Sequence, residues 1–199
     1  MKAVIEHYNM LIDENNDPAR DSEALRAYMD KWDGDRFIES MQLDTDKTVL
    51  EIGVGTGRLA MKVAPQCHAF CGIDVSEKTV QRTKENLESY QNVSLICDDF
   101  MLHTFDERFD VIYSSLTFMH IKDKQYAIQK VSALLNDNGL FVLSIDKNQD
   151  EFIDMGTRKI KVYPDDPNHI CRYIADSQLK RIDSFETEYA HIIISQKAI

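Results

Sequence analysis

The stretch VLEIGVGTGRLA (residues 49–60) decides the fold of this chain of 199 residues. A short apolar run leads into three glycines at alternate positions, Gly53, Gly55 and Gly57, and a helix-forming run follows. Glycines let the backbone turn sharply and let a ligand approach the main chain closely. A strand, a glycine loop and a helix in this order predict a ligand at the carboxyl end of a strand in an open α/β sheet.

Further apolar runs of strand length follow the glycine loop, over residues 68–74, 92–97, 109–115 and 139–145. These runs do not alternate apolar and polar residues, which is typical of strands in a parallel sheet covered on both faces. Helical patterns lie between several of them, over residues 57–65, 76–90 and 122–136, with Gly139 expected to end the last. The alternation predicts βαβ units, hence an α/β fold with helices on both faces of the sheet.

The C-terminal segment departs from this pattern. Pro167 can open a helix that runs to about Gln178, and RIDSFETEYAHIIISQK (181–197) then contains two strand-like runs with almost nothing between them. Two adjacent strands without a crossover helix must pair antiparallel. We therefore expect a mostly parallel sheet with an antiparallel strand near its end.

The segment before the glycine loop is helical in pattern. It contains one short helical pattern at about residues 2–12, a second that Ser22 can cap, and a third in GDRFIESMQL (34–43). We expect an N-terminal helical extension over residues 1–45 without a core of its own. The main domain is then expected over residues 46–199.

Charge and composition exclude several classes of protein. Lys and Arg number 23 and Asp and Glu 34, so the net charge of −11 argues against nucleic acid and anionic membranes as partners. The four cysteines form no Cys-x-x-Cys pair and no His pair has zinc spacing, so we expect no metal site. The N-terminus lacks a signal-peptide pattern and no run of 18 apolar residues occurs, so we expect a cytoplasmic protein.

Two ligands compete for the glycine loop. The segment GTGRLA (55–60) fits the dinucleotide fingerprint G-x-G-x-x-G/A, which would indicate an NAD-linked oxidoreductase. A dinucleotide places its pyrophosphate at the helix N-terminus, and Glu51 at the end of the preceding strand opposes that anion. The same carboxylate suits S-adenosylmethionine, which has an ammonium group and no phosphate.

Acidic residues also end the next two strands. Asp74 follows Gly57 by 17 residues and can accept hydrogen bonds from ribose hydroxyls, a feature that both ligands would use. Asp98 and Asp99 precede Phe100, and an acid beside an aromatic ring suits adenine. The alternative is a solvated loop with an Asx turn.

Taken together, these motifs resemble a class I S-adenosylmethionine-dependent methyltransferase of the small, single-domain type. The resemblance covers about residues 46–199 and rests on VLEIGVGTGRLA, CGIDVS, LICDDF, FDVIYSSLTFMHI and LLNDNGLFVLS. Many relatives have Pro-Gly-Gly before the fifth strand, where this chain has Asn136-Asp137-Asn138-Gly139 in a turn of similar function. The resemblance implies a Rossmann-like, doubly wound sheet of seven strands with a reversed final hairpin, and makes residues 46–199 the catalytic domain.

The resemblance also implies roles for individual residues. The implied cofactor-binding residues are Tyr8, Glu51, Gly53, Gly55, Gly57, Asp74, Val75, Asp98, Asp99, Phe100, Ser114 and Leu116. The glycine loop would wrap the methionine portion, Asp74 would hold the ribose, and Asp98 and Phe100 would complete the adenine pocket. Tyr8 would close over the cofactor from the N-terminal helix.

Methyl transfer is an in-line displacement that depends on alignment and on the exclusion of water. His120, which follows the fourth strand, is the candidate base if the acceptor arrives protonated, and otherwise a packing residue at a helix start. The expected function is methyl transfer from S-adenosylmethionine to a small-molecule acceptor. A cofactor-binding module without catalysis is the alternative, and the oligomeric state stays open.

Two regions are candidates to cover the acceptor. One is the N-terminal extension with Tyr8, Tyr28 and Trp32, and the other is the segment 147–166 after the fifth strand, a possible substrate lid. Four residues of this segment could meet an anionic substrate or protect a solvated strand edge: Arg158, Lys159, Lys161 and Tyr163. No Asn-Pro-Pro-Tyr-like motif follows the fourth strand, which also disfavours nucleic acid.

Overall fold

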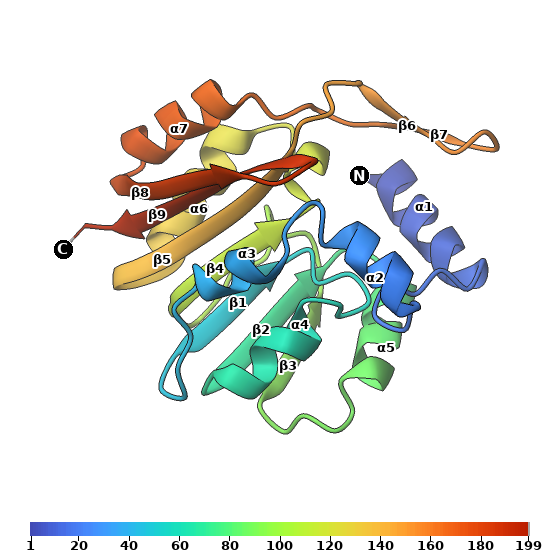
Figure 1. Ribbon diagram of the computed structural model, residues 1–199, viewed down its shortest axis with the longest axis horizontal. Coiled ribbons are helices and arrows are strands. Elements are labelled where there is room, and N and C mark those ends of the chain that lie inside the picture. Colours follow the sequence, from blue (N-terminus) through green and yellow to red (C-terminus); the bar gives the residue numbers. More distant parts are fainter. Residues whose placement is uncertain (199) are drawn as a thin grey trace.

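A computed structural model describes residues 1–198 of the chain (Figure 1). Ile199, the last residue of the predicted domain, lies outside the described residues. The sheet consists of β1 (Thr48–Ile52), β2 (Ala69–Asp74), β3 (Val93–Cys97), β4 (Phe109–Ser115), β5 (Leu135–Asp146), β8 (Leu179–Glu186) and β9 (Ala190–Lys197). The helices are α1 (Lys2–Asp13), α2 (Glu23–Met29), α3 (Asp35–Glu39), α4 (Ala60–Val63), α5 (Glu77–Asn86), α6 (Lys124–Leu134) and α7 (Pro167–Asp176).

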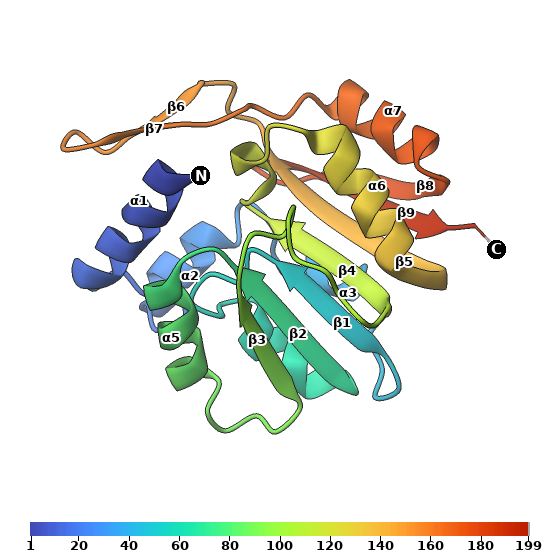
Figure 2. The same cartoon turned by 180° about the vertical axis from the view of Figure 1, so that it is seen from behind.

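The shorter elements complete the chain. The 3-10 turns are η1 (Ala64–Gln66) and η2 (Phe118–His120), and β6 (Phe152–Asp154) pairs with β7 (Lys159–Lys161) in a separate hairpin. Figures 1 and 2 show this hairpin beside α1, away from the main sheet. None of the helices within residues 1–198 combines the length and apolar character needed to cross a bilayer.

The order of the strands is β3-β2-β1-β4-β5-β9-β8. Strands β1 to β5 pair parallel with their neighbours, whereas β9 runs antiparallel to both β5 and β8. This arrangement confirms the prediction of seven strands, mostly parallel, with an antiparallel last strand. The chain builds outward from β1 in both directions, so the strand order reverses between β1 and β4, where open α/β sheets bind their ligands.

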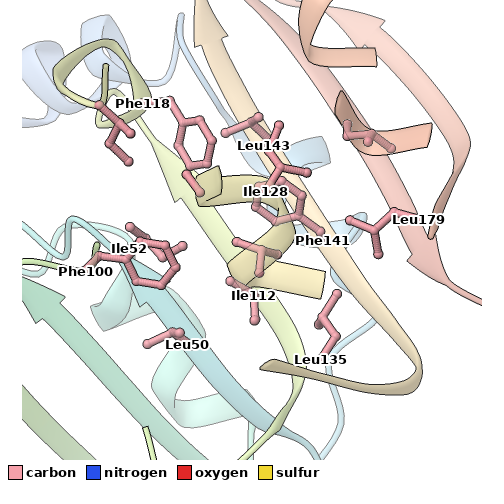
Figure 3. Packing of buried hydrophobic residues seen from close by; sticks show 14 of the residues in the cluster. Leu50, Ile52, Phe100, Ile112, Phe118, Ile128, Leu135, Phe141, Leu143 and Leu179 are labelled. Atoms are coloured by element: carbon pink, nitrogen blue, oxygen red, sulfur yellow. The ribbon is translucent and has the colours of Figure 1, made fainter. Parts of the chain in front are cut away.

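Helices cover both faces of the sheet (Figures 1 and 2). On one face, Phe37 of α3 and Val63 of α4 pack against apolar side chains of β1, β2 and β4. On the other face, Ile128 of α6 and Ile170 of α7 pack on Phe141 and its neighbours, as Figure 3 shows for Ile128 and Phe141. The predicted doubly wound architecture is therefore confirmed.

Some of the helix ends predicted from the sequence agree with the structure, and others differ from it. Ser76 caps α5 by accepting a hydrogen bond from the Thr79 amide, as its position after β2 predicts. The helix predicted over 76–90 ends at Asn86, because Leu87 turns into the core beneath Gly57. The helix predicted from residue 57 begins only at Ala60, since Gly57 has φ 93°, outside the helical region.

The prediction that Gly139 ends a helix is wrong. Helix α6 ends at Leu134 and β5 starts at the next residue, so Gly139 lies within the strand. The segment 136–139 forms a bulge there, because Phe109 pairs with Leu135 while Val111 pairs with Leu140. A Cβ on Gly139 would lie 2.8 Å from the Asn136 carbonyl oxygen, so a close backbone approach explains the glycine.

The N-terminal extension shares the core of the sheet through α3. Phe37 and the following Met41 are fully buried in the same apolar cluster as Val49 and Tyr113. Helix α2, by contrast, buries no side chain. The division of the chain at residue 45 stays a prediction, and this packing joins its two parts.

Replacement of Phe37 by alanine tests this packing. We expect Phe37→Ala to lower the free energy of unfolding by about 3–5 kcal/mol, because it removes a fully buried ring from between α3 and the sheet. Urea denaturation measures the change, and Leu25→Ala on the exposed face of α2 is the control, with a change within about 0.5 kcal/mol. Equal effects of the two variants would contradict a shared core.

Candidate active site

A cavity of about 310 Å³ opens at the carboxyl ends of β1 to β4, where the strand order reverses. Segments from four strand ends line it: 51–56, 73–75, 98–100 and 115–117. The N-terminal extension and the turn after β4 add apolar side chains: Met1, Val4, Leu11, Ile12, Met29, Met119 and Ile121. The cavity therefore joins a polar floor of strand ends to an apolar cover.

Most of the predicted site residues line this cavity. They are Tyr8, Glu51, Gly53, Gly55, Asp74, Val75, Asp98, Asp99, Phe100, Leu116 and His120. Gly57 and Ser114 do not line it. A Cβ at Gly57 would lie 3.2 Å from the methyl group of Thr83, so this glycine allows α5 to approach the loop from behind. Ser114 is fully buried and donates a hydrogen bond to the Ile52 carbonyl oxygen (2.9 Å).

Strand alternation explains the displacement of Ser114. Successive side chains of a strand point to opposite faces, and the cavity receives Ser115 instead. Leu116 follows with φ 56°, a left-handed conformation that an apolar residue rarely adopts. The chain thus turns sharply at the end of β4, directly beside the glycine loop.

The glycine loop is held in shape by its neighbours. Gly53 has φ 79°, and a Cβ there would collide with the side chain of Thr117. The Gly55 amide donates to Asp74 (3.1 Å), and the Gly55 carbonyl oxygen accepts from the Thr83 hydroxyl. These contacts attach the loop to β2 and α5, so it presents its backbone to the cavity in one conformation.

Glu51 is a buried carboxyl group at the edge of the cavity, with the residue 3% exposed. The Tyr113 hydroxyl donates a hydrogen bond to it (2.7 Å). Burial raises the pKa of Glu51 to about 8, against the opposing influence of Tyr113 and Arg58. An ammonium group placed beside Glu51 would favour its ionised form, because an opposite charge lowers the pKa of a carboxyl group.

Asp74 joins β2 to the glycine loop. One carboxylate oxygen accepts from the Gly55 amide (3.1 Å) and the other from the Ser76 amide (3.0 Å). Burial raises the pKa of Asp74, while these amides oppose the rise. Each oxygen keeps a further lone pair for a hydroxyl donor in the cavity.

The loop after β3 combines both alternatives considered from its sequence. The Asp99 carboxylate accepts from the Met101 amide (2.9 Å), which is an Asx turn, and Asp98 contacts the ring of His103 (2.9 Å). Both acids nevertheless line the cavity. Phe100 is 5% exposed and packs into the core beneath it (Figure 3).

His120 and Tyr8 meet across the apolar end of the cavity. The Tyr8 hydroxyl and Nε2 of His120 are 2.8 Å apart, and the rings stand edge to face. Burial lowers the pKa of His120 to about 4, and the positive charges of His7, Lys124 and the Met1 amino group act in the same direction. His120 is therefore neutral at pH 7, and its Nδ1 is buried without a partner among residues 1–198.

Lys124 fixes the turn that carries His120. Its ammonium group donates to the carbonyl oxygens of Phe118 (2.8 Å) and Ile121 (3.1 Å) and pairs with Asp165 at 2.7 Å. Lys124 and Asp165 are 11% and 2% exposed at their side chains. This buried pair ties η2 to the end of the 147–166 segment.

The 147–166 segment contacts α1 and does not itself line the cavity. Arg158 pairs with both oxygens of Glu14 (2.6 and 2.8 Å) and donates to His7 (2.8 Å), so its charge is already engaged. Lys159 and Lys161 are exposed on β7. These placements favour the solvated edge over contacts with an anionic substrate, and the lid stays a prediction.

Two aromatic residues proposed to cover the acceptor lie elsewhere. Tyr28 and Trp32 pack against each other and against Tyr189, and Trp32 donates to Asp146 (3.1 Å). Neither lines the cavity, whereas Met29 does. The side chain that α2 contributes is therefore apolar and not aromatic.

A charged pair that was not predicted from the sequence lies at the wall of the cavity. Arg58, 10% exposed at its side chain, lines the cavity and pairs with the fully buried carboxylate of Asp33. The Ser115 hydroxyl also donates to Asp33 (2.9 Å). In the sequence, Asp33 only breaks a helical pattern, and no local signal marks its contact with the glycine loop.

Known proteins resemble this chain in sequence and in fold. Residues 43–195 match a family model described as a methyltransferase domain. A ubiquinone biosynthesis O-methyltransferase of Coxiella burnetii is 32% identical over 116 residues, which cover 57% of this chain and 50% of that protein. The chain thus spans about half the length of the curated relatives it matches.

Two solved structures share the whole fold. Magnesium protoporphyrin IX methyltransferase from Synechocystis PCC 6803, crystallised with bound SAM, has a TM-score of 0.78 at 15% identity, covering 99% of this chain and 96% of that chain. The [4+2]-cyclase SpnF has a TM-score of 0.76 at 15% identity, covering 98% and 96%. At these identities the likeness extends to the fold and leaves the chemistry to the site.

The raised pKa of Glu51 predicts how stability depends on pH. Between the unfolded value of 4.5 and the folded value of about 8, the folded protein holds a proton that the unfolded chain releases, so stability falls as pH rises through this range. We expect Glu51→Gln to lose part of this decline in urea denaturation from pH 5 to 9. The exposed control Glu107→Gln should keep it, and equal slopes for Glu51→Gln and the wild type would contradict the prediction.

Proposed function

The chain belongs to the class I S-adenosylmethionine-dependent methyltransferase family, and from this premise we propose that it transfers a methyl group from S-adenosylmethionine to a small-molecule acceptor. The buried Glu51 carboxyl group beside the glycine loop carries this proposal. A carboxyl group at this position suits the ammonium group of the cofactor's methionine portion. It opposes the pyrophosphate of a dinucleotide, which would need a positive site there.

The other strand ends fit the remainder of the cofactor. Asp74 has lone pairs for the ribose hydroxyls, and Val75 lies next to it on the cavity wall. Asp98 and Phe100 would flank the adenine, with backbone groups of the Asx turn at its edge. Acids at three successive strand ends support a positively charged nucleoside without phosphate.

The protein's contribution to catalysis is alignment and the exclusion of water. S-adenosylmethionine, when bound, supplies a methyl carbon activated by its sulfonium. Apolar side chains of α1, among them Val4, Leu11 and Ile12, cover the cavity and keep water from the reacting atoms. Alignment of this kind can contribute as much as about 7–11 kcal/mol to lowering the barrier.

Tyr8 and His120 are the groups that would handle a proton of the acceptor. Neutral imidazole offers one unprotonated nitrogen, and Nε2 lies within hydrogen-bond distance of the Tyr8 hydroxyl. Since Nδ1 is buried, the acceptor would contact the Tyr8 oxygen. A proton leaving the acceptor would then pass to Tyr8 while the Tyr8 proton moves to His120.

The surroundings of this pair favour a small, apolar acceptor. Besides Tyr8 and His120, this end of the cavity is lined by methionine and aliphatic side chains such as Met29, Leu116 and Met119. The names of two similar proteins refer to ubiquinone biosynthesis and to magnesium protoporphyrin IX, which supports a small-molecule acceptor. The net charge of −11 disfavours nucleic acid.

A transfer assay with labelled S-adenosylmethionine tests the proposal. Small phenols, alcohols, amines and carboxylic acids are offered as acceptors, and calorimetry measures binding of S-adenosylhomocysteine and NAD. We expect S-adenosylhomocysteine to bind and one acceptor class to become labelled. Binding of S-adenosylhomocysteine without methyl transfer to any acceptor would favour a cofactor-binding module without catalysis. Binding of NAD but not of S-adenosylhomocysteine would refute the proposal.

The Asp74 carboxylate is predicted to contribute directly to cofactor affinity. We expect Asp74→Ala to weaken S-adenosylhomocysteine binding roughly ten- to a hundredfold, the loss of about 1.5–3 kcal/mol typical of charged hydrogen bonds. Isothermal calorimetry provides the measurement. The exposed control Asp106→Ala should bind like the wild type, and unchanged affinity of Asp74→Ala would remove Asp74 from the site.

Replacement of His120 should separate turnover from cofactor binding. We expect His120→Ala to reduce turnover about a hundredfold or more with little change in cofactor affinity, because it removes the proton-accepting partner of Tyr8. In the wild type, the acidic limb of the rate profile should lie near pH 4 and not near 6.5. The exposed His68→Ala is the control, and an unaltered rate in His120→Ala would make His120 structural.

A further inference from the structure

Arg58 contacts two carboxyl groups at the wall of the cavity, and a third lines the same cavity. Its guanidinium donates to Asp33 (3.0 Å for one of two contacts) and more weakly to Asp30 (3.3 Å). The third carboxyl group, Glu51, lies near enough for Arg58 to lower its pKa, and both residues line the cavity. Within residues 1–198, the hydrogen bonds of the Arg58 guanidinium nevertheless go to Asp30 and Asp33 of the N-terminal extension.

The Asp33 carboxylate is held in one position, in which it binds the guanidinium of Arg58. Its side chain is fully buried, and besides Arg58 it accepts from the Ser115 hydroxyl (2.9 Å) and the Gly34 amide (2.8 Å). Gly34 has φ 75°, a left-handed conformation that glycine adopts without strain, and this turn follows Asp33 directly. A buried carboxylate with this many donors is fixed in place, and it fixes Arg58 in turn.

Glu51 keeps a free position because Arg58 is engaged elsewhere. Its hydrogen-bond partner among residues 1–198 is the Tyr113 hydroxyl, and no ion pair forms between Glu51 and Arg58. A guanidinium released from Asp33 would share the cavity wall with the buried carboxyl group of Glu51. A charge-assisted pair between them would occupy the carboxylate that the ammonium group needs.

We propose that Asp33 is a positioning residue that holds Arg58 away from Glu51 and so keeps Glu51 available to the ammonium group of the cofactor. This inference rests on the proposed function. It assigns a role in cofactor binding to a residue of the N-terminal extension that does not itself line the cavity. The Arg58 guanidinium and the ammonium group of the cofactor could each pair with Glu51. Asp33 binds the guanidinium and so leaves Glu51 to the ammonium group.

A double substitution separates this role from a structural one. We expect Asp33→Asn to weaken the binding of S-adenosylhomocysteine about tenfold, because Arg58 turns to Glu51. Adding Arg58→Gln should restore the affinity to within about threefold of the wild type, since the competitor is gone. A purely structural role predicts that the second substitution leaves the loss unchanged or deepens it.

Calorimetry at pH 7.5 gives both affinity and stoichiometry, so a misfolded fraction lowers the stoichiometry and leaves the dissociation constant unaffected. Asp30→Asn is the matched control: it removes the weaker partner of Arg58, leaves Asp33 in place, and should bind within about twofold of the wild type. Binding of Asp33→Asn like the wild type, or equal weakness of the single and double variants, would overturn the inference.

The outcomes also separate this inference from the proposed function. If Asp33→Asn does not fold, the double variant with Asp33→Asn and Arg58→Gln is used for the test. This variant has no unpaired buried cation, because the Arg58 guanidinium is removed. Its affinity should remain near that of the wild type, and a loss above about tenfold would mean that Arg58 or Asp33 holds the cofactor directly. If the wild type itself fails to bind S-adenosylhomocysteine, the proposed function fails first.

Discussion

The ligand preference of the cavity depends on one buried carboxyl group that forms no ion pair within residues 1–198. Glu51 stands at the end of β1, where a carboxyl group withdrawn from water is unfavourable in its charged form. The Tyr113 hydroxyl donates a hydrogen bond to it, and the guanidinium of Arg58, on the same cavity wall, is held by Asp33. A cavity lined by such a group favours a cationic ligand, because the positive charge of the ligand stabilises the ionised carboxylate.

Different interactions hold the floor of the cavity, which the strand ends form, and its cover, which α1 forms. The strand ends belong to a sheet whose apolar residues are buried on both faces, so the floor of the site is rigid. The cover, α1, buries little of its own surface and is attached through polar side chains. Asn9 contacts Ser76, Asp13 pairs with Lys78, and Glu14 pairs with Arg158. Partly exposed polar contacts of this kind contribute little free energy, so the cover can separate from the sheet at small energetic cost.

Most of the fold and of the cavity floor could be predicted from the sequence because both depend on local patterns. Apolar runs, the glycine loop and the acids after each strand sit at fixed distances along the chain, and parallel strands bring their carboxyl ends together. Contacts between residues distant in sequence could not be predicted in this way. The pleat of β4 directs Ser115 to Asp33 beside the cavity and Ser114 into the sheet. Arg158 has two possible roles in the sequence, and only its pairing with Glu14 of α1 distinguishes them. The contact of Asp33 with Arg58 has no local sequence signal at all.

The position of the ligand's ammonium group can be seen in a crystal structure of the chain with S-adenosylhomocysteine. We expect the ammonium nitrogen within about 3 Å of a Glu51 carboxylate oxygen, where the guanidinium of Arg58 is absent. The adenine should lie between Val75 and Phe100. Density for the ligand with its ammonium group on another residue, or for a diphosphate bridge beside the glycine loop, would contradict the account.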